Sequence, residues 1–211
     1  MPVWENPLTP PSALIVPCAI SGLTMPANAV PFNQDWRGIS AATFQKFSAF
    51  QHNSPEFIGR VVIPIRSITD KIVSFCGRHQ GQNDPKYLFH PSGNSLPLFP
   101  LVKPIQGKII LVEGIMDMMN LHDKGLTNAV CAFGVNKVNE DKINILKIQG
   151  VSGIDIFFDN DEAGQNASAK LKELLEHNEL VSRNVIYGKI KDPGELTALQ
   201  VIKLKETLYN G

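Results

Sequence analysis

The stretch "GIDIFFDNDEAGQNASAKLKELLEH" (residues 153–177) joins an apolar run, two closely spaced aspartates and a long amphipathic pattern. The apolar run predicts a buried strand over 153–158, and the apolar spacing of the remainder predicts a helix over 161–177. Asp159 and Asp161 stand between them. Carboxylates this close repel each other unless a cation or solvent compensates for their charge. The stretch therefore predicts a strand, a charged loop and a helix, with a cation site as one explanation of the loop.

The same order of strand and helix recurs on both sides of this stretch. Apolar runs predict further strands at 108–112, 128–133 and 183–190, and helical spacing predicts helices over 114–125, 139–149 and 195–209. Parallel strands need connections of helix length, which this alternation supplies. We therefore predict an α/β domain with a mostly parallel sheet of about four strands and helices on both faces.

The first half of the chain has a different pattern. Seven prolines within residues 1–33 disfavour helix and most sheet positions, although "ALIVPCAISGL" (13–23) could form a short strand. Ser40 is a candidate N-cap for a short helix, and the alternation over 59–81 predicts a hairpin. We predict a Pro-rich segment over 1–33, a smaller α+β subdomain over 34–104 and the parallel domain over 105–211.

Composition sets broad limits on function. The chain has 211 residues, is 43% hydrophobic, and carries 20 Lys and Arg against 20 Asp and Glu, so net charge neither indicates nor excludes a nucleic-acid partner. Cys18, Cys76 and Cys131 are far apart and form no CxxC pair, which argues against a disulfide framework or a cysteine zinc site. No apolar run reaches about 18 residues, so we expect no membrane partner and an intracellular location.

Acidic residues gather at the ends of the predicted strands. Glu113 ends the strand at 108–112, Asp159 and Asp161 follow the strand at 153–158, and Asp192 follows the strand at 183–190. Asp117 lies about one helical turn after Glu113. Ligands of open α/β sheets bind at the carboxyl ends of strands, and oxygen-only ligands suit Mg²⁺. The pattern predicts a Mg²⁺ site at one edge of the sheet.

Helix capping is the alternative explanation of these acids. Asp and Glu after a strand often cap the next helix, and Asp161 fits that role well. Capping alone does not explain why Glu113 ends a strand before a glycine, or why Asp159 precedes Asp161 in the same loop.

Three stretches together resemble the Toprim domain of DnaG-type primases, topoisomerases and some nucleases: "ILVEGIMDMMNLHDKGLTNAVCAFG", "IDIFFDNDEAGQNASAKL" and "KDPGEL". Four upstream strings, "RGIS" (37–40), "GRVVIPIR" (59–66), "FCGRHQG" (75–81) and "PKYLFHP" (85–91), are similar to the N-terminal subdomain of the bacterial and phage primase catalytic core. The resemblance runs from about residue 35 to the C-terminus and favours the primases within this group.

The resemblance implies a DNA primase catalytic fragment, a DNA-directed RNA polymerase that makes short RNA primers on single-stranded DNA during replication. It implies Glu113, Asp159 and Asp161 as catalytic metal ligands and Asp117 and Asp192 as further acids near the ions, which would be Mg²⁺, or Mn²⁺ in its place. Arg66, Arg78 and Lys86 would bind the template strand, the nucleotide or the primer.

The implied partners are single-stranded DNA, ribonucleoside triphosphates, a separate zinc-binding module and a replicative helicase, in the cytoplasm of a bacterium or a phage-infected cell. No zinc site is expected in this chain. Gly194 stands where the primase pattern usually has another acid. The group of acids around Asp192 is therefore smaller than the pattern implies, and a second metal ion would bind more weakly there. Two alternatives stay open: a Mg²⁺-dependent Toprim nuclease, and a non-catalytic nucleic-acid-binding subunit of a replication complex.

Overall fold

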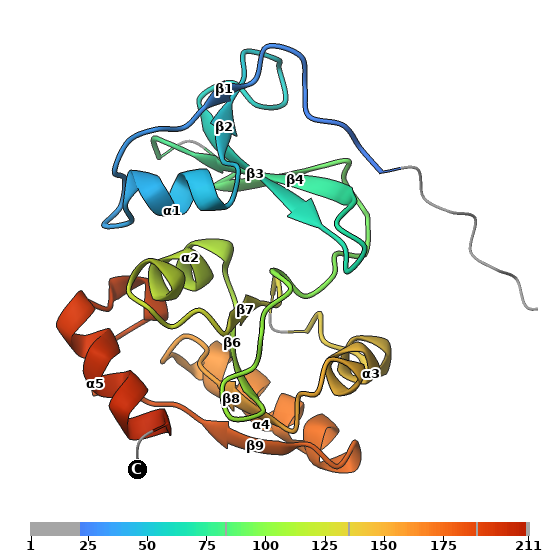
Figure 1. Cartoon of the computed structure of the whole chain (residues 1–211), viewed down its shortest axis with the longest axis vertical. Coiled ribbons are helices and arrows are strands. Elements are labelled where there is room, and N and C mark those ends of the chain that lie inside the picture. The colour runs from blue at the N-terminus through green and yellow to red at the C-terminus, as the bar shows by residue number, and fades with distance from the viewer. Residues whose placement is uncertain (1–21, 83, 135, 189, 210–211) are drawn as a thin grey trace, which may run out of the picture.

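A computed structural model describes residues 22–82, 84–134, 136–188 and 190–209. These residues form two sheets with helices around the second one (Figure 1). Cys18 lies outside the described residues. Of the strand considered for 13–23, only residues 22 and 23 are described. Within them, Leu23 forms an antiparallel bridge with Ile72. None of the helices in these ranges is long and apolar enough to cross a membrane.

The first sheet is antiparallel, with its strands in sequence order. Its strands are β1 (Val30–Pro31), β2 (Phe50–Gln51), β3 (Arg60–Arg66), β4 (Ile72–His79) and β5 (Tyr87–His90). Strands β3 and β4 form the predicted hairpin, paired from Arg60 opposite His79 to Arg66 opposite Ile72. Helix α1 (Ala41–Lys46) begins after Ser40, whose hydroxyl accepts a hydrogen bond from the Thr43 amide as expected of an N-cap.

The second sheet is parallel, in the order β7-β6-β8-β9, which confirms the predicted α/β architecture. Its strands are β6 (Lys108–Val112), β7 (Ala129–Cys131), β8 (Gly153–Ile156) and β9 (Val181–Asn184). The helices are α2 (Ile115–Asp123), α3 (Glu140–Ile148), α4 (Glu162–His177) and α5 (Ala198–Tyr209), with a single 3-10 turn, η1 (Pro193–Glu195), before α5.

The last strand was placed too late by the sequence. We predicted it over 183–190, whereas β9 covers Val181–Asn184. Among the described residues its one neighbouring strand is β8, which ends at Ile156. The Val185 amide donates the last hydrogen bond between them, to the Ile156 carbonyl at 2.8 Å. Beyond this point the apolar residues have no strand to pair with. Asp192 therefore follows a loop and opens η1, and it does not directly follow a strand.

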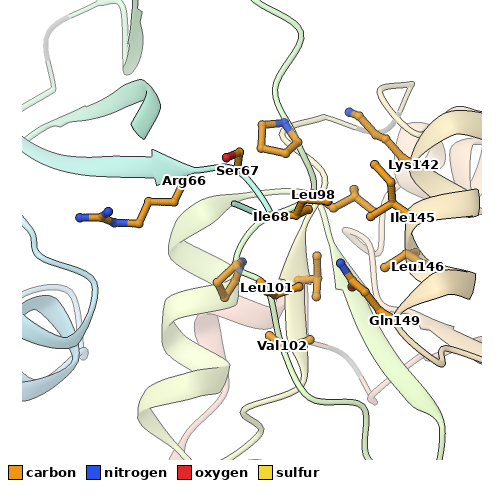
Figure 2. A pocket seen from close by; sticks show the side chains of 13 residues that line it. Arg66, Ser67, Ile68, Leu98, Leu101, Val102, Lys142, Ile145, Leu146 and Gln149 are labelled. Carbon is orange, nitrogen blue, oxygen red and sulfur yellow. The ribbon is translucent and has the colours of Figure 1, made fainter. Parts of the chain in front are cut away.

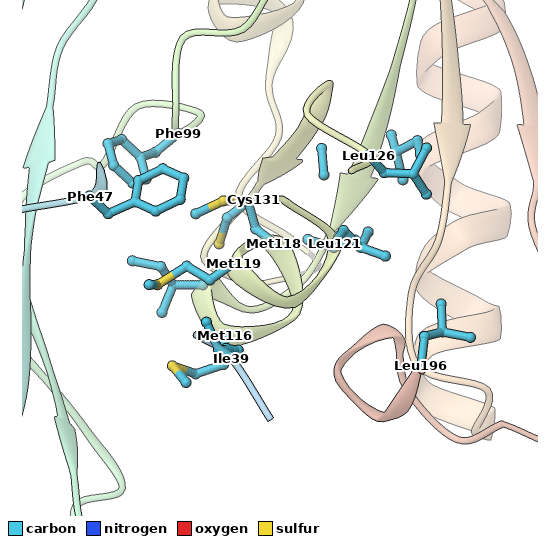
Figure 3. Packing of buried hydrophobic residues seen from close by; sticks show 14 of the residues in the cluster. Ile39, Phe47, Phe99, Met116, Met118, Met119, Leu121, Leu126, Cys131 and Leu196 are labelled. Atoms are coloured by element: carbon cyan, nitrogen blue, oxygen red, sulfur yellow. The ribbon is translucent and has the colours of Figure 1, made fainter. Parts of the chain in front are cut away.

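Alternate residues of β6 face opposite layers of helix, which explains why the run "KIILV" is apolar throughout. Ile110 and Val112 pack with α2 and α5, while Ile109 and Leu111 pack with α3 and α4. The first of these layers also includes Ile63 of β3 and other side chains of the first sheet and α1. Phe47, just after α1, lies beside Phe99 in this layer (Figure 3). One apolar core therefore joins the two sheets, with α2 between them (Figure 1).

The boundaries of the predicted domains stay a prediction. The first sheet includes β1 at Val30–Pro31, and Phe32 is buried in its core at 1% exposure, so ordered packing begins a few residues before position 34. The change from antiparallel to parallel pairing falls between β5 and β6.

His122 is a buried titratable group of α2 that lies beside the shared core. Its ring lies edge-on to Phe47, with the centroids 5.2 Å apart. Since a carbonyl only accepts, the Nε2–H group donates to the Ala129 carbonyl at 2.8 Å, and Nδ1 faces the Lys46 Nζ at 3.3 Å. Burial, and to a lesser extent Lys46, lowers the pKa of His122 from 6.5 to about 4. A neutral imidazole is therefore part of the folded state.

We predict that acid destabilises the protein through His122. The pKa of His122 is lower in the folded state, so between about pH 6.5 and pH 4 the unfolded chain binds a proton that the folded chain does not. The free energy of unfolding therefore falls as the pH drops through this range. The loss should total roughly 2–3 kcal/mol. In His122→Gln this part of the pH dependence should disappear from urea unfolding curves. The exposed His177 provides the control variant His177→Gln, and an unchanged slope in His122→Gln would contradict the prediction.

Candidate functional site

The parallel pairing of β6 with β8 brings two acids together at the carboxyl edge of the second sheet. Leu111 lies opposite Ile156, and the chain leaves both strands within the next few residues. Glu113 and Asp159 thereby come side by side, and the Asp159 amide donates to the Glu113 Oε1 at 3.2 Å. This bond orients the glutamate toward the loop that carries the aspartates.

Asp117 and Asp192 reach the same edge from α2 and η1. The Gly114 amide donates to the Asp117 Oδ2 at 3.1 Å, which fixes this carboxylate against the first turn of α2. The buried Asn120, one turn further on, donates to the Pro193 and Leu196 carbonyls at 2.9 and 3.1 Å. These two bonds hold η1 against α2, so Asp192 at the start of η1 lies near Asp117.

The acids line a cavity of about 300 Å³ between the two sheets. One wall comes from the parallel sheet and its loops, the other from β4 and β5 of the antiparallel sheet. The lining residues are Glu113, Gly114, Ile115, Asp117, Phe133, Gly134, Asp159 and Asp192 on the first wall, and Cys76, Lys86, Tyr87 and Phe89 on the second. Four of the five predicted acids therefore meet in one cavity, and Lys86 faces them.

Negative charge is only partly compensated in this cavity. Burial raises the pKa of Asp117 from 3.8 to about 7, with Asp192 and Asp159 adding to the effect. Burial, together with the neighbouring carboxylates, also raises the pKa values of Glu113 and Asp159. Lys191 and Lys86 act on Asp159 in the opposite direction. A bound cation would relieve the same repulsion.

Two glycines allow the acids to approach so closely. A Cβ at Gly194 would lie 2.7 Å from the Asp117 Oδ1 and 3.0 Å from the Asp192 Oδ1. A further acid at this position would therefore displace both carboxylates. A Cβ at Gly164, in the first turn of α4, would overlap the carbonyl oxygen of Asp159. The glycine in "DNDEAG" is thus required by the contact between α4 and the loop before it.

Asp161 does not line the cavity as described. Its Oδ1 accepts the Gly164 amide at 2.9 Å and caps α4, which is the role that the alternative explanation gave it. Its charge is still close enough to raise the pKa values of Glu113 and Asp159. Its role as a metal ligand stays a prediction.

The three predicted basic residues do not form one track. Arg66 pairs with Ile72 and Arg78 with Val61, at opposite ends of the β3–β4 hairpin, and Arg66 does not line the carboxylate cavity. Arg66 forms an ion pair with Asp70 at 3.4 Å, and its side chain points away from the pocket that its backbone borders (Figure 2). Of the three, only Lys86 lines the carboxylate cavity.

Arg78 stands behind the cavity wall. Its guanidinium lies 5.0 Å from the centroid of the Tyr87 ring, and its Nη1 donates to the Lys86 carbonyl at 3.3 Å. Arg78 is 6% exposed, and its Nε has no hydrogen-bond partner among the described residues. We infer that it positions Tyr87 and Lys86; direct binding of a ligand by Arg78 stays a prediction.

The sequence analysis did not single out the aromatic residues that line the cavity, Tyr87, Phe89 and Phe133, or Lys191. Tyr87 and Phe89 alternate on β5 and both line the cavity, which the string "KYLFHP" signals by its spacing. Phe133 follows β7 with a φ of 58°, and this conformation depends on the surrounding fold. Lys191 precedes Asp192, and its carbonyl accepts the Asn160 amide at 2.7 Å.

Across the described ranges, no three His, Cys, Asp or Glu side chains are arranged so that they could hold a metal ion. The carboxylates therefore converge on the cavity without forming a closed cage. Mg²⁺ commonly uses one or two protein carboxylates and completes its shell with water and phosphate oxygens, so an open oxygen-lined cavity with excess negative charge fits such an ion.

Comparison with known proteins agrees with this geometry. A family model described as Toprim-like matches residues 110–197. A DNA primase of Thermotoga maritima is 35% identical over 153 residues, covering 66% of this chain and 26% of that protein. The zinc-binding and RNA polymerase domains of the Aquifex aeolicus primase superpose with a TM-score of 0.71 at 24% identity, covering 82% of this chain and 53% of that one. A DnaG primase catalytic domain bound to single-stranded DNA gives 0.65 at 21% identity, covering 79% and 71%.

The resemblance derived from the sequence is thereby confirmed, as is the fold of a primase catalytic core with a Toprim-like domain. The chain spans about a quarter of the length of the first curated relative, 26%, and 20% of the next, also a DNA primase.

We predict that Gly164→Ala destabilises the protein although alanine favours helix more than glycine does. The new methyl group would overlap the Asp159 carbonyl oxygen and come 3.0 Å from the carbonyl carbon, so the loop or α4 has to shift. The expected loss is about 1–3 kcal/mol in chemical unfolding. Asn166→Ala, at an exposed position of the same helix, is the matched control. Equal stability of the Gly164 and Asn166 variants would contradict the close approach.

Proposed function

We propose that this chain is the catalytic part of a DNA primase and that its carboxylate cavity joins ribonucleotides on a single-stranded DNA template. In this reaction a 3′-hydroxyl attacks the α-phosphate of a ribonucleoside triphosphate. A P–O bond to the primer forms, the bond from the α-phosphorus to the oxygen that bridges to the β-phosphate breaks, pyrophosphate leaves, and the hydroxyl proton passes to solvent. The carrying observation is that Glu113, Asp117, Asp159 and Asp192 line one cavity with Lys86 opposite, in a primase-like fold.

A divalent cation, Mg²⁺ or Mn²⁺, is the cofactor that fits this cavity. Its donors are carboxylate oxygens, which suit hard cations. We assign Glu113 and Asp159 as its principal ligands, with Asp117, Asp192 and Asp161 as nearby acids. When bound, such an ion supplies charge stabilisation to the attacking oxygen and to the leaving pyrophosphate.

The remaining cavity residues suit the binding of a nucleotide. Lys86 lies 5.9 Å from the Tyr87 ring centroid and close enough to Asp159 to lower its pKa, so its ammonium can contact a phosphate beside the acids. Tyr87, Phe89 and Phe133 present aromatic faces or edges to the same space, where a base can stack. The Asp159 amide and the Gly114 amide keep Glu113 and Asp117 in place before substrate enters.

The partners of this reaction follow from the proposal. The DnaG domain among the structural neighbours is described with bound single-stranded DNA, and the Aquifex aeolicus neighbour includes a zinc-binding domain. We propose that this chain also uses single-stranded DNA, and that a zinc-binding module supplies recognition of the start site. A replicative helicase is the further proposed partner. Primer synthesis would take place on replicating DNA in the cytoplasm of a bacterium or a phage-infected cell.

Primer synthesis by Asp159→Asn tests the proposed function. The substitution keeps the shape of the side chain but removes its charge, and we expect synthesis on a single-stranded template with Mg²⁺ to fall about 100-fold or more. The assay follows incorporation of labelled ribonucleotides, with a primase zinc-binding module added in parallel reactions. Asp141→Asn changes an exposed acid of α3 and serves as the matched control.

Each alternative has its own outcome in the same assay. Full activity of Asp159→Asn would remove the aspartate from the mechanism. Shortening of labelled single strands with Mg²⁺ and no nucleotides would favour a nuclease. DNA binding by the unmodified chain without incorporation, even with the zinc-binding module present, would favour a non-catalytic subunit.

A further inference from the structure

A second cavity, of about 500 Å³, adjoins the carboxylate cavity. Both cavities are lined by Phe89 and Phe133, whose rings meet edge to face with centroids 5.7 Å apart. The Gly134 amide donates to the Glu113 carbonyl at 3.2 Å, which ties the Phe133 turn to the acidic edge. The aromatic pair is therefore a wall common to both cavities.

The two cavities differ in charge. The lining of the second cavity consists of Phe89, Pro91, Gly93, Asn94, Ser95, Leu96, Ala132, Phe133, Asn136, Lys137, Asn139 and Lys142. Within the described part of the chain this lining includes two lysines and neutral polar groups, and no Asp or Glu. The nearest acids in sequence, Glu140 and Asp141, are exposed in the first turn of α3 and do not line it.

Lys142 is the distinctive residue of this cavity. It is 9% exposed, and in the described ranges no carboxylate lies within ion-pair distance of its Nζ. Its Nζ donates to the Lys137 carbonyl at 2.6 Å, which uses one of three N–H groups. Burial and the nearby Lys137 lower its pKa. A buried ammonium without a negative partner is unfavourable, and an anion in the cavity would remove that cost.

The stem of Lys142 explains how a charged residue is held there. The stem borders a small apolar pocket of about 40 Å³ with Leu98, Val102 and Leu146. Figure 2 shows the amino group directed away from Leu146 and Gln149 of the same helix. The methylenes therefore pack with apolar side chains while the charged end reaches the second cavity.

We propose that the second cavity holds one nucleotide of the single-stranded DNA template, with its phosphodiester on Lys142 and Lys137 and its base against Phe89 and Phe133. The inference rests on the proposed function and assigns the path of the strand beside the carboxylates. Asn94, Asn136 and Asn139 add neutral hydrogen-bonding groups around the same space. A volume of about 500 Å³ is in the range of sites for small organic ligands.

Binding of DNA by Lys142→Met tests the inference without any catalytic step. Methionine keeps most of the buried stem and removes the charge. With a fluorescein-labelled oligothymidylate in EDTA and no nucleotides, we expect the Kd from anisotropy to rise about 5–10-fold, and the slope of log Kd against log salt to fall by about 1. Lys137→Ala should act in the same direction. Lys170→Met, at an exposed position of α4, should bind as the unmodified chain does.

Two outcomes would overturn the inference. Unchanged affinity and salt slope in Lys142→Met would exclude the phosphate contact, provided that urea unfolding shows the variant to be folded. Weaker binding of ATP with Mg²⁺ together with unchanged binding of DNA would assign the cavity to the nucleotide triphosphate and not to the strand. Loss of primer synthesis in Asp159→Asn with normal DNA binding would support the proposed function. It would also show that DNA binding, which tests the inference, is measured separately from catalysis.

Discussion

The pairing of β6 with β8 is the constraint from which the site follows. Two parallel strands in this register end side by side. The first polar residues after them, Glu113 and Asp159, therefore lie next to each other at the edge of the sheet. The apolar residues within the strands are buried between two layers of helix, so a slip by one position would move each side chain into the opposite layer and disrupt the packing on both faces. Stability of the sheet and position of the acids therefore have the same physical origin.

The fold holds repelling charges together by distributing their support over several elements. Backbone amides bind Glu113 and Asp117, and Asn120 fastens η1 to α2 from beneath. Glycines leave the room that the carboxylates fill. On the opposite wall the antiparallel sheet supplies Lys86 and aromatic rings, and beyond them the lining becomes positive. Acidic and basic surfaces thus lie next to each other along one path, an arrangement suited to a ligand that carries phosphates and needs a cation at one point.

Much of this could be predicted from the sequence, for reasons that particular residues make clear. Strand-end position identified Glu113 and Asp159 because a buried parallel strand is recognisable from its unbroken apolar run. Helix α1 was recognisable from its N-cap at Ser40. The length of β9 was not, because it depends on where β8 ends, which its own residues do not encode. The two possible roles of Asp161 could not be separated, since capping and metal binding favour the same residue at the same position. Arg66 was grouped with Lys86, but only Lys86 lines the cavity. Lys142 went unnoticed because its burial depends on residues 91–102, a distant segment between β5 and β6 that lines the same two pockets.

The apolar core shared by the two sheets has a consequence for motion. Side chains of α1, β3, α2 and α5 belong to one continuous cluster behind the cavity, so separating its walls would expose packed apolar surface. A hinge that opens and closes around substrate is disfavoured by such packing. We therefore expect the two walls of the cavity to keep their spacing when a ligand enters between them.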